Sequence, residues 1–319
     1  MLEMRMTGLL VLLFAPWNVQ ARAIYGVDDR SDPWDWLAQG QLATVAQAAR
    51  ATAVHIVEEN LAFDPARGDY SVLAKTLEQR TRGQGLSLCP GERFGNQLTA
   101  GNCSATLIAP NRILTAGHCI SGNSIPGPTP MTEPSEESCR RARYVFGYEA
   151  MSKTDSGPKR VAVDQVYNCK SVVKYSYDGT AMTSSIPDFA IVELDREVRV
   201  ASQPNLLPVE IDPRTEIPVG TKIALISYPS GLPIKIAPGV TVPSTVPGSI
   251  QMETDAYVGS SGGAVLALDT QKIIGIMVSG NGGGYYFRSD ARFEEGGCLG
   301  SKFYDPSQAA EHATPATGF

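Results

Sequence analysis

The sequence has few of the residues that build metal clusters. It holds three histidines in 319 residues, and none of its six cysteines forms a Cys-x-x-Cys pair. Structural zinc is usually held by closely spaced cysteines and histidines. We therefore expect no bound metal.

Excess charge of either sign is also missing. Charged residues make up 19% of the chain and the formal net charge is −6. The nearest approach to a basic patch is the short cluster Arg140, Arg141 and Arg143, which is typical of a solvated loop or strand edge. A nucleic-acid partner is therefore not expected.

Long apolar runs are absent after residue 23, where nothing approaches the roughly 18 residues that a membrane-spanning helix needs. The first 23 residues resemble a signal peptide, with Arg5, the run LLVLLFA at 9–15, and small residues at Ala21 and Ala23. A buried N-terminal helix is the alternative interpretation. We expect an exported protein, extracellular or periplasmic, without a membrane span once the signal is removed. The even number of cysteines agrees with export, because disulfides persist in oxidising compartments.

The chain is long and apolar enough to build a core, since 43% of its residues are hydrophobic. Residues 34–53 and 71–82 have helical periodicity with few breakers. From Cys103 onward, short β-rich runs alternate with Gly, Pro, Ser and Asn, which indicates a closed antiparallel barrel or a sandwich. We predict strands at 104–109, 112–115, 144–148, 161–167, 189–194, 222–227, 248–253, 264–268 and 272–278.

Three separated motifs carry chemistry, and the first is CSATLIAPNRILTAGHC at 103–119. A β-rich run leads to His118, with Cys103 and Cys119 at the two ends. A disulfide between them would close the segment and hold the imidazole in place, at a gain of about 3 kcal/mol. A histidine that only packs beside a disulfide is the alternative.

The second motif is PDFAIVEL at 187–194, in which Asp188 opens an apolar strand. A carboxylate drawn inward there needs a hydrogen-bonding partner to offset its desolvation, and an imidazole N–H is suitable. An aspartate before a strand is also common in turns, so this motif is weak alone.

The third motif is GSSGGAV at 259–265, followed by a strand. Glycines around a serine allow backbone conformations that a side chain would forbid. They can also turn successive N–H groups toward one point, which is how an oxyanion hole is built. A flexible Gly/Ser turn is the alternative.

The order His118, Asp188, Ser261, with TAGHC, DFAIVEL and GSSGG around them, resembles the trypsin-like (chymotrypsin-fold) serine peptidases. The segments LCPGERF at 88–94 and YPSGLPIK at 228–235 are similar to the bacterial branch that includes glutamyl-endopeptidase-like enzymes. The similarity covers roughly residues 89–298.

This resemblance implies an all-β fold of two packed antiparallel six-stranded β-barrels with a partly helical N-terminal extension. The proline-rich segment 201–220 suits the connection between the barrels, and the last residues look like a frayed tail. The expected division is a signal peptide at 1–23, an extension with the first barrel strand at 24–88, the first barrel at 89–200, the second barrel at 201–305, and a C-terminal tail at 306–319.

The resemblance also implies hydrolysis of proteins or peptides through an acyl-enzyme, without a cofactor. Ser261 would attack the scissile carbonyl, His118 would take its proton, and Asp188 would hold the imidazole tautomer. The N–H groups of Gly259 and Ser261 would face the oxyanion. Ser261 is preferred to Ser260 because a glycine must stand two residues before the nucleophile.

Cleavage specificity is less defined. Asp255 lies six residues before Ser261, where trypsin carries the acid of its pocket, although a structural role for Asp255 is the stronger interpretation. Glutamate preference in related enzymes relies on a histidine that would fall near Met277, and none is there. Ser279, Gly280 and Asn281 are expected to line the pocket wall.

Two alternatives to a peptidase remain open. A secreted, non-hydrolytic homologue that binds a partner protein usually loses a triad residue, and none is missing here. An esterase would have the chain order Ser, Asp, His and a helix after its G-x-S-x-G turn. With Cys103 paired to Cys119, the other cysteines allow three connectivities, of which we favour Cys139–Cys169 with Cys89–Cys298.

Overall fold

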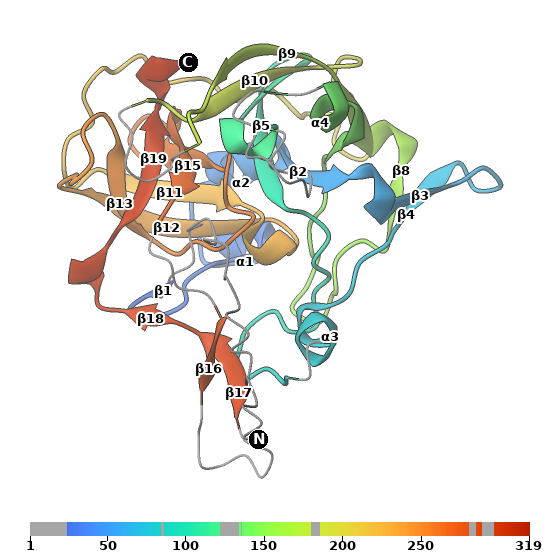
Figure 1. Cartoon of the computed structure of the whole chain (residues 1–319), viewed down its shortest axis with the longest axis horizontal. Helices are drawn as coiled ribbons and strands as arrows, with labels where there is room; N and C mark the ends of the chain where they lie inside the picture. The colour runs from blue at the N-terminus through green and yellow to red at the C-terminus, as the bar shows by residue number, and fades with distance from the viewer. Residues whose placement is uncertain are drawn as a thin grey trace, which may run out of the picture.

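A computed structural model describes residues 24–83, 86–121, 134, 136–179, 186–280, 285–288 and 297–319. Two closed six-stranded antiparallel barrels dominate it (Figure 1), as the resemblance implies. The first barrel has the strand order β10-β6-β5-β2-β7-β9 and the second β11-β12-β13-β19-β15-β14. Their bounds are β2 Thr52–Val57, β5 Cys103–Ala109, β6 Arg112–Thr115, β7 Ala142–Val145, β9 Val166–Ser176, β10 Phe189–Leu194, β11 Lys222–Ser227, β12 Lys235–Val242, β13 Ile250–Thr254, β14 Ala264–Ala267, β15 Ile273–Ser279 and β19 Glu311–Pro315.

Alternation along the strands builds two cores. On β11, Ile223 and Leu225 belong to the cluster inside the second barrel, whereas Ala224 and Ile226 belong to the cluster that is continuous with the first barrel. Successive side chains of a strand point to opposite faces, so one apolar strand serves both clusters. The shared cluster packs the barrels against each other without a separate interface layer.

Smaller elements surround the barrels. Strands β3 and β4 form a hairpin that projects from the body and pairs with β8, while β16 and β17 form a second ribbon (Figure 1). Strand β1 pairs in parallel with β18. The bounds of these elements are β1 Ile24–Tyr25, α1 Pro33–Ala38, α2 Ala43–Arg50, β3 Leu61–Asp64, β4 Asp69–Val72, α3 Leu77–Arg82, α4 Glu136–Arg141, β8 Arg160–Ala162, β16 Tyr285–Arg288, β17 Cys298–Ser301 and β18 Phe303–Tyr304.

The helical segments are shorter than expected. The predicted helix at 34–53 is two helices, because the chain turns at Gly40, whose φ is +72°. Its last residues already belong to β2, where Thr52, Val54 and Ile56 favour a strand over a helix. In the segment 71–82 the helix begins only after Thr76, which accepts a hydrogen bond from the N–H of Gln79 in a capping box.

Two barrel strands contradict the sequence-based expectations. Strand β12 was not predicted, because Pro238 and Gly239 interrupt its pattern, yet Pro238 pairs with Ala224. The expectation of a frayed tail at 306–319 is wrong, since β19 completes the second barrel by pairing with both β13 and β15. Strands β6, β10 and β11 have the predicted bounds. The strand predicted at 144–148 is β7, which begins two residues earlier, at Ala142. The strand predicted at 161–167 is divided between β8 and β9, which a 3-10 turn joins.

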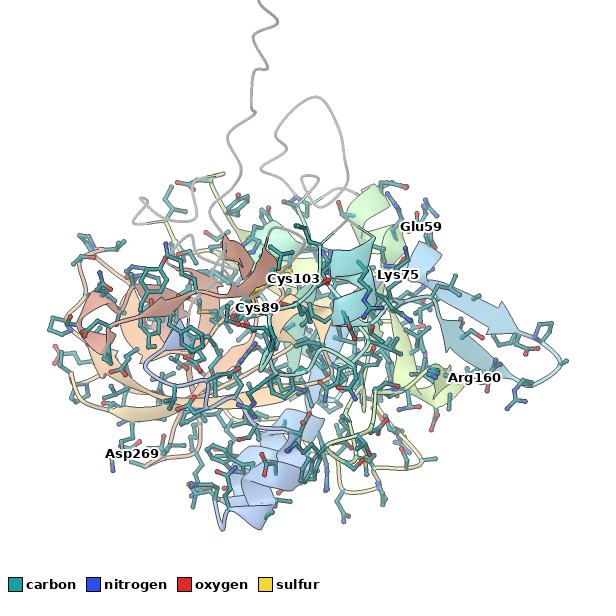
Figure 2. The ribbon with its side chains drawn as sticks, turned by 90° about the horizontal axis from the view of Figure 1, so that it is seen from below. Glu59, Lys75, Cys89, Cys103, Arg160 and Asp269 are labelled. Atoms are coloured by element: carbon teal, nitrogen blue, oxygen red, sulfur yellow. A yellow bond between two sulfur atoms is a disulfide. The ribbon has the colours of Figure 1, made fainter. Side chains whose placement is uncertain are left out.

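Three disulfides join the chain as favoured from the sequence: Cys103–Cys119, Cys139–Cys169 and Cys89–Cys298. Figure 2 labels Cys89, which bonds to Cys298, and Cys103, which bonds to Cys119. The Cys89–Cys298 bond spans 209 residues and ties the segment between α3 and β5 to β17. In the chain-entropy model, this long loop lowers the conformational entropy of the unfolded chain more than the 16-residue loop closed by Cys103–Cys119 does.

Candidate active site

His118 lies where β6 ends and the chain turns into a short 3-10 helix, Gly117–Cys119. The Cys103–Cys119 disulfide ties this turn to the start of β5. A ring nitrogen of His118 and the Sγ atoms of the two cysteines lie within 4.8 Å of one another. Gly117 has no room for a side chain, because a Cβ there would lie 2.4 Å from the carbonyl oxygen of Ser176. The position of the imidazole is therefore fixed by covalent and steric constraints.

Asp188 directly precedes β10 and binds His118 twice. Its Oδ2 lies 2.7 Å from Nδ1 of the imidazole, and its Oδ1 accepts the backbone N–H of His118 at 3.0 Å. The aspartate is only 4% exposed. A buried carboxylate is costly unless it is hydrogen-bonded, so these two donors offset its desolvation.

Thr314 of β19 holds the main chain of Asp188. Its hydroxyl accepts the Asp188 N–H at 3.1 Å and donates to the Asp188 carbonyl at 3.0 Å. A strand of the second barrel therefore positions an aspartate of the first. The sequence analysis missed Thr314, because EHATP holds one β-branched residue, Thr314 itself, and so gives little local signal of a strand.

The pKa of His118 reflects two opposing influences. Burial lowers it, but the negative charge of Asp188 and their hydrogen bond together raise it above its ordinary value of 6.5. Asp188 therefore stabilises the imidazolium, which is the form a general base takes after it accepts a proton.

Ser261 stands in a tight turn packed against the His118 segment. Its carbonyl accepts the N–H of Ser104 at 2.8 Å and lies 3.7 Å from Sγ of Cys119. Gly262 has φ of +77°, and a Cβ there would lie 2.2 Å from the Ser104 carbonyl oxygen. The disulfide beside His118 thus also contacts the serine turn, although the two motifs are more than 140 residues apart.

The two neighbouring serines differ. Ser260 is fully buried, and its Oγ accepts hydrogen bonds from the hydroxyl of Ser227 at 3.1 Å and the N–H of Tyr257 at 3.2 Å. These bonds give the Ser260 side chain a structural role. The preference for Ser261 as the reactive hydroxyl rests on this difference as well as on the glycine spacing.

Backbone N–H groups at this turn fall into two sets. Those of Ser260, Gly262 and Gly263 donate to protein carbonyls at 2.7–2.8 Å. Those of Gly259 and Ser261 donate to no carbonyl or side chain among the described residues. Gly259 has φ of +97°, which a residue with a side chain rarely adopts, so the turn requires glycine here.

Asp255 is hydrogen-bonded to the N-terminal segment. Its Oδ1 accepts the N–H of Tyr25 at 2.9 Å and its Oδ2 accepts that of Asp29 at 3.2 Å. Burial, and then the nearby charge of Asp29, raise the pKa of Asp255 to about 8. Both carboxylate oxygens therefore anchor the N-terminal segment, which favours the structural interpretation of this residue.

The other expected pocket residues lie where β15 ends. Ser279 and Gly280 are buried, and β15 runs beside the serine turn because the Gly262 N–H donates to the Met277 carbonyl at 2.7 Å. Asn281 lies outside the described residues.

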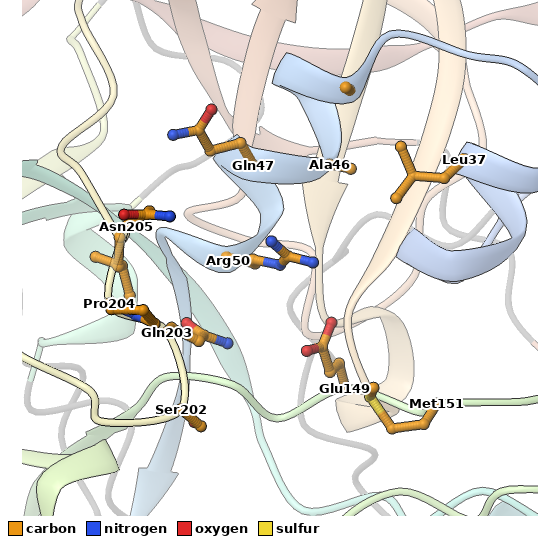
Figure 3. A pocket seen from close by; sticks show the side chains of 12 residues that line it. Leu37, Ala46, Gln47, Arg50, Glu149, Met151, Ser202, Gln203, Pro204 and Asn205 are labelled. Carbon is orange, nitrogen blue, oxygen red and sulfur yellow. The ribbon is translucent and has the colours of Figure 1, made fainter.

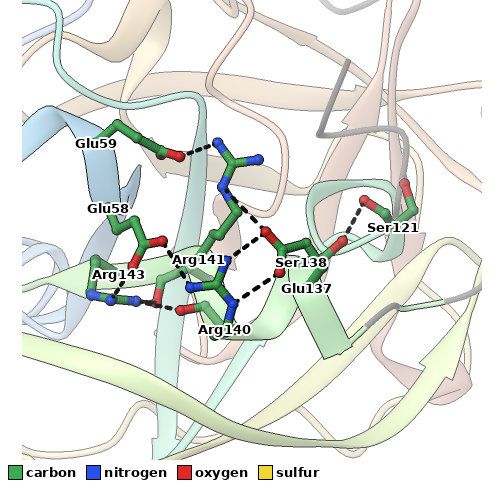
Figure 4. A network of polar contacts seen from close by, with 9 residues as sticks. Glu58, Glu59, Ser121, Glu137, Ser138, Arg140, Arg141 and Arg143 are labelled. Atoms are coloured by element: carbon green, nitrogen blue, oxygen red, sulfur yellow. Dashed lines mark hydrogen bonds and ion pairs between the residues drawn. The ribbon is translucent and has the colours of Figure 1, made fainter. Parts of the chain in front are cut away.

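The three clustered arginines are neutralised by glutamates (Figure 4). Arg143 binds Glu58 at 2.6 Å, Arg140 binds Glu58 at 3.2 Å, and Arg141 binds Glu59. Each arginine of the cluster therefore has an acidic partner.

A separate cavity of 490 Å³ lies between α2 and the chain at 202–206 (Figure 3). Arg50 and Glu149 face it, and none of the site residues predicted from the sequence lines it.

Comparison with known protein families agrees with the two barrels. The family model for the trypsin-like peptidase domain matches residues 103–276, more than half of the chain. The chain therefore belongs to the trypsin-like peptidase family, and its two barrels are the chymotrypsin-like fold.

Similar solved structures include human heparin binding protein, at 14% identity and a TM-score of 0.44, covering 86% of this chain and 89% of that one. A mutant of the same human protein gives 15% identity and a TM-score of 0.43, covering 69% and 83%. Likeness at this level carries no argument about activity. No curated protein sequence matches the chain.

Proposed function

We propose that this trypsin-like peptidase is a serine endopeptidase with Ser261 as nucleophile, His118 as general base and Asp188 as the residue that orients the imidazole. The observation that supports it most is the pair of hydrogen bonds between Asp188 and His118, at 2.7 and 3.0 Å. With Nδ1–H directed to Asp188, Nε2 is the nitrogen that can accept a proton.

In the proposed reaction, the Ser261 hydroxyl attacks the scissile carbonyl as His118 takes its proton. His118 then protonates the leaving amine, which leaves an acyl-enzyme on Ser261. Water, activated by His118, attacks the ester and regenerates the serine. The reaction needs no cofactor, and its substrates are proteins or peptides.

The N–H groups of Gly259 and Ser261 would stabilise the tetrahedral oxyanion. Their lack of an acceptor among the described residues supports this role. The Ser260, Gly262 and Gly263 N–H groups are already bonded and so hold the turn in shape. Each donor of an oxyanion hole typically lowers the barrier by about 3 kcal/mol.

We further propose that the protein is exported and loses residues 1–23, and that it belongs to the bacterial glutamyl-endopeptidase-like branch. Three disulfides suit an extracellular or periplasmic location. Among the described residues, no helix combines the length and apolar character needed to cross a membrane. Amino-terminal sequencing of the exported protein tests the cleavage site, which is expected after Ala23.

A fluorophosphonate probe tests the nucleophile. The exported full chain is treated with the probe, and the labelled peptide is mapped by mass spectrometry beside an assay of casein hydrolysis. The label should fall on Ser261, and Ser261→Ala should abolish both labelling and hydrolysis. The matched control Ser260→Ala should still be labelled, since the Ser260 hydroxyl is already engaged by the Ser227 hydroxyl and the Tyr257 N–H.

A folded wild-type protein that neither takes the label nor cleaves casein would contradict the proposal. It would favour the non-hydrolytic, partner-binding homologue.

A further inference from the structure

The cavity between α2 and the chain at 202–206 has the size and the lining of a ligand site. Its volume is 490 Å³, and small-molecule sites in proteins usually measure about 300–1,000 Å³. The cavity is formed by α2, by the chain that follows β7 and by the segment that connects the two barrels (Figure 3). No residue proposed for catalysis lines it, so a ligand there would be separate from the substrate of the reaction.

Two opposite charges face this cavity without pairing with each other. Arg50 comes from the last turn of α2 and Glu149 from the chain after β7, and both side chains extend toward the same space (Figure 3). Among the described residues, the two form no ion pair, and neither side chain makes a hydrogen bond. Burial raises the pKa of Glu149 above its ordinary value, and the charge of Arg50 offsets this only in part. A ligand that carried both charges could pair with both residues.

Gln203 adds a hydrogen-bond acceptor that the protein does not use. Its Oε1 is buried and accepts no hydrogen bond from the part of the chain that the structure describes. Its backbone N–H donates to the Val200 carbonyl at 2.8 Å, which holds the residue in place at the cavity wall. Because a buried polar atom is costly while unpaired, a donor on a ligand would be favourable here.

The cavity also has an apolar side. Leu37 and Met151 line it and are 40% and 69% exposed, and the half-buried Leu206 lies beside them. A ligand site typically combines such apolar side chains with a few polar groups that fix the orientation of the ligand. An apolar group on the ligand would remove part of this surface from water.

We propose that the cavity binds a short peptide of about two or three residues with free amino and carboxyl termini and an apolar side chain. Arg50 would bind the carboxylate, because its planar fork of donors matches that group. Glu149 would bind the ammonium group, and Oε1 of Gln203 would accept a peptide N–H. A ligand with a single charge would leave one of the two facing charges unpaired. The site does not depend on the proposed function, although hydrolysis of a peptide bond generates the same two termini.

The test measures peptide binding to the full-length Ser261→Ala protein, which lacks the proposed nucleophile and so should leave the probe intact. The probe is the dipeptide Ala-Leu, followed by isothermal titration calorimetry, and we expect a Kd of about 1 mM or lower. N-acetyl-Ala-Leu and Ala-leucinamide each lack one terminal charge and should bind at least about 10-fold more weakly. Ala-Ser, which lacks the apolar side chain, should also bind about 10-fold more weakly.

Variants of the two charged residues assign each terminus to its partner. Arg50→Gln and Glu149→Gln should each weaken the binding of Ala-Leu at least about 10-fold. Arg50→Gln should bind Ala-Leu and Ala-leucinamide equally, because the carboxylate then has no partner. Glu149→Gln should bind Ala-Leu and N-acetyl-Ala-Leu equally, for the corresponding reason at the amino terminus. A residue with only a structural role would not produce this crossed pattern.

Stability and a matched control complete the design. Neither variant should lower the melting temperature, since the Arg50 side chain makes no hydrogen bond among the described residues and Glu149→Gln removes a charge that burial disfavours. Arg67→Gln is the control, because Arg67 is an exposed arginine of the turn between β3 and β4, outside the cavity. It should bind Ala-Leu as the parent protein does.

Four results would overturn the proposal. These are no binding of Ala-Leu, equal binding of the free and blocked peptides, tighter binding of N-acetyl-Ala-Leu, which would indicate an anion site only, and binding that neither cavity substitution alters, which would place the dipeptide elsewhere. Because the blocked peptides are compared on a protein with an unaltered cavity, the proposal stays testable even if a variant fails to fold. Failure of the proposed function appears separately, as the absence of labelling at Ser261 of the wild type.

Discussion

Replacing Thr314 by valine tests whether the second barrel positions the aspartate of the first. Valine is close to threonine in shape but lacks the hydroxyl that accepts the Asp188 N–H at 3.1 Å and donates to its carbonyl at 3.0 Å. A buried hydrogen bond contributes about 1 kcal/mol, and a backbone group left unpaired costs about 1–3 kcal/mol. Loss of both bonds should therefore destabilise the protein by about 2–4 kcal/mol.

Activity should respond as well. When the main chain of Asp188 shifts, its carboxylate no longer aligns with Nδ1 of His118, and misplacement of this kind can cost about 100-fold in rate. We expect a fall of about 10- to 100-fold in kcat with little change in KM. The acid limb of the pH profile should also move to lower pH, because Asp188 is what raises the pKa of His118 against its burial.

The assay combines urea unfolding with kcat/KM measured across pH, and Thr314→Ser is the matched control because it keeps the hydroxyl. Serine should stay within about 1 kcal/mol of wild type and retain the pH profile. If Thr314→Val matched Thr314→Ser in stability, kcat and acid limb, the argument that β19 positions Asp188 would be refuted.

Three further changes give distinct results. Asp188→Asn removes the charge that raises the pKa of His118 and leaves the burial that lowers it. We therefore expect kcat to fall about 10⁴-fold and the acid limb of the pH–rate profile to move to lower pH. An acid limb at the wild-type pH would count against the pairing of Asp188 with His118. Replacing Cys103 and Cys119 by alanine should lower the free energy of unfolding by about 3 kcal/mol in urea, and an unchanged midpoint would show that the bond does not constrain the unfolded chain. Burial raises the pKa of Asp255 from 3.8 to about 8. Between these two pH values Asp255 binds more protons in the folded than in the unfolded protein, so the free energy of unfolding falls as pH rises from 3.8 to about 8. Asp255→Asn should flatten this decline in urea titrations from pH 4 to 8, and parallel curves for the two proteins would contradict it.

Local sequence predicted several elements well. Strands β6, β10 and β11 have the expected bounds, because each is a short apolar run closed by turn residues on both sides. The Cys103–Cys119 bond was expected because both cysteines belong to one hairpin-like segment. Signals of this kind depend only on neighbours in the chain.

Other elements depend on partners far away in the chain. Strand β12 carries Pro238 and Gly239, which argue against a strand locally, but its place between β11 and β13 supplies the pairing. Strand β19 is five residues long and buried along nearly its whole length, so it shows no polar–apolar alternation to detect. The helix predicted at 34–53 is interrupted at Gly40, and only its last two residues are taken into β2 by closure of the first barrel.

The sequence by itself determined the order and type of the chemical groups: an imidazole at His118, a carboxylate at Asp188 and a hydroxyl at Ser261, each in a local motif that fixes its backbone. Only the tertiary structure decided which acids serve which purpose. Asp255 binds the N-terminal segment, whereas Asp188 binds His118. The physical reason is that a carboxylate's role follows from the donors that surround it after folding, and the donors around Asp255 come from a segment more than 200 residues away.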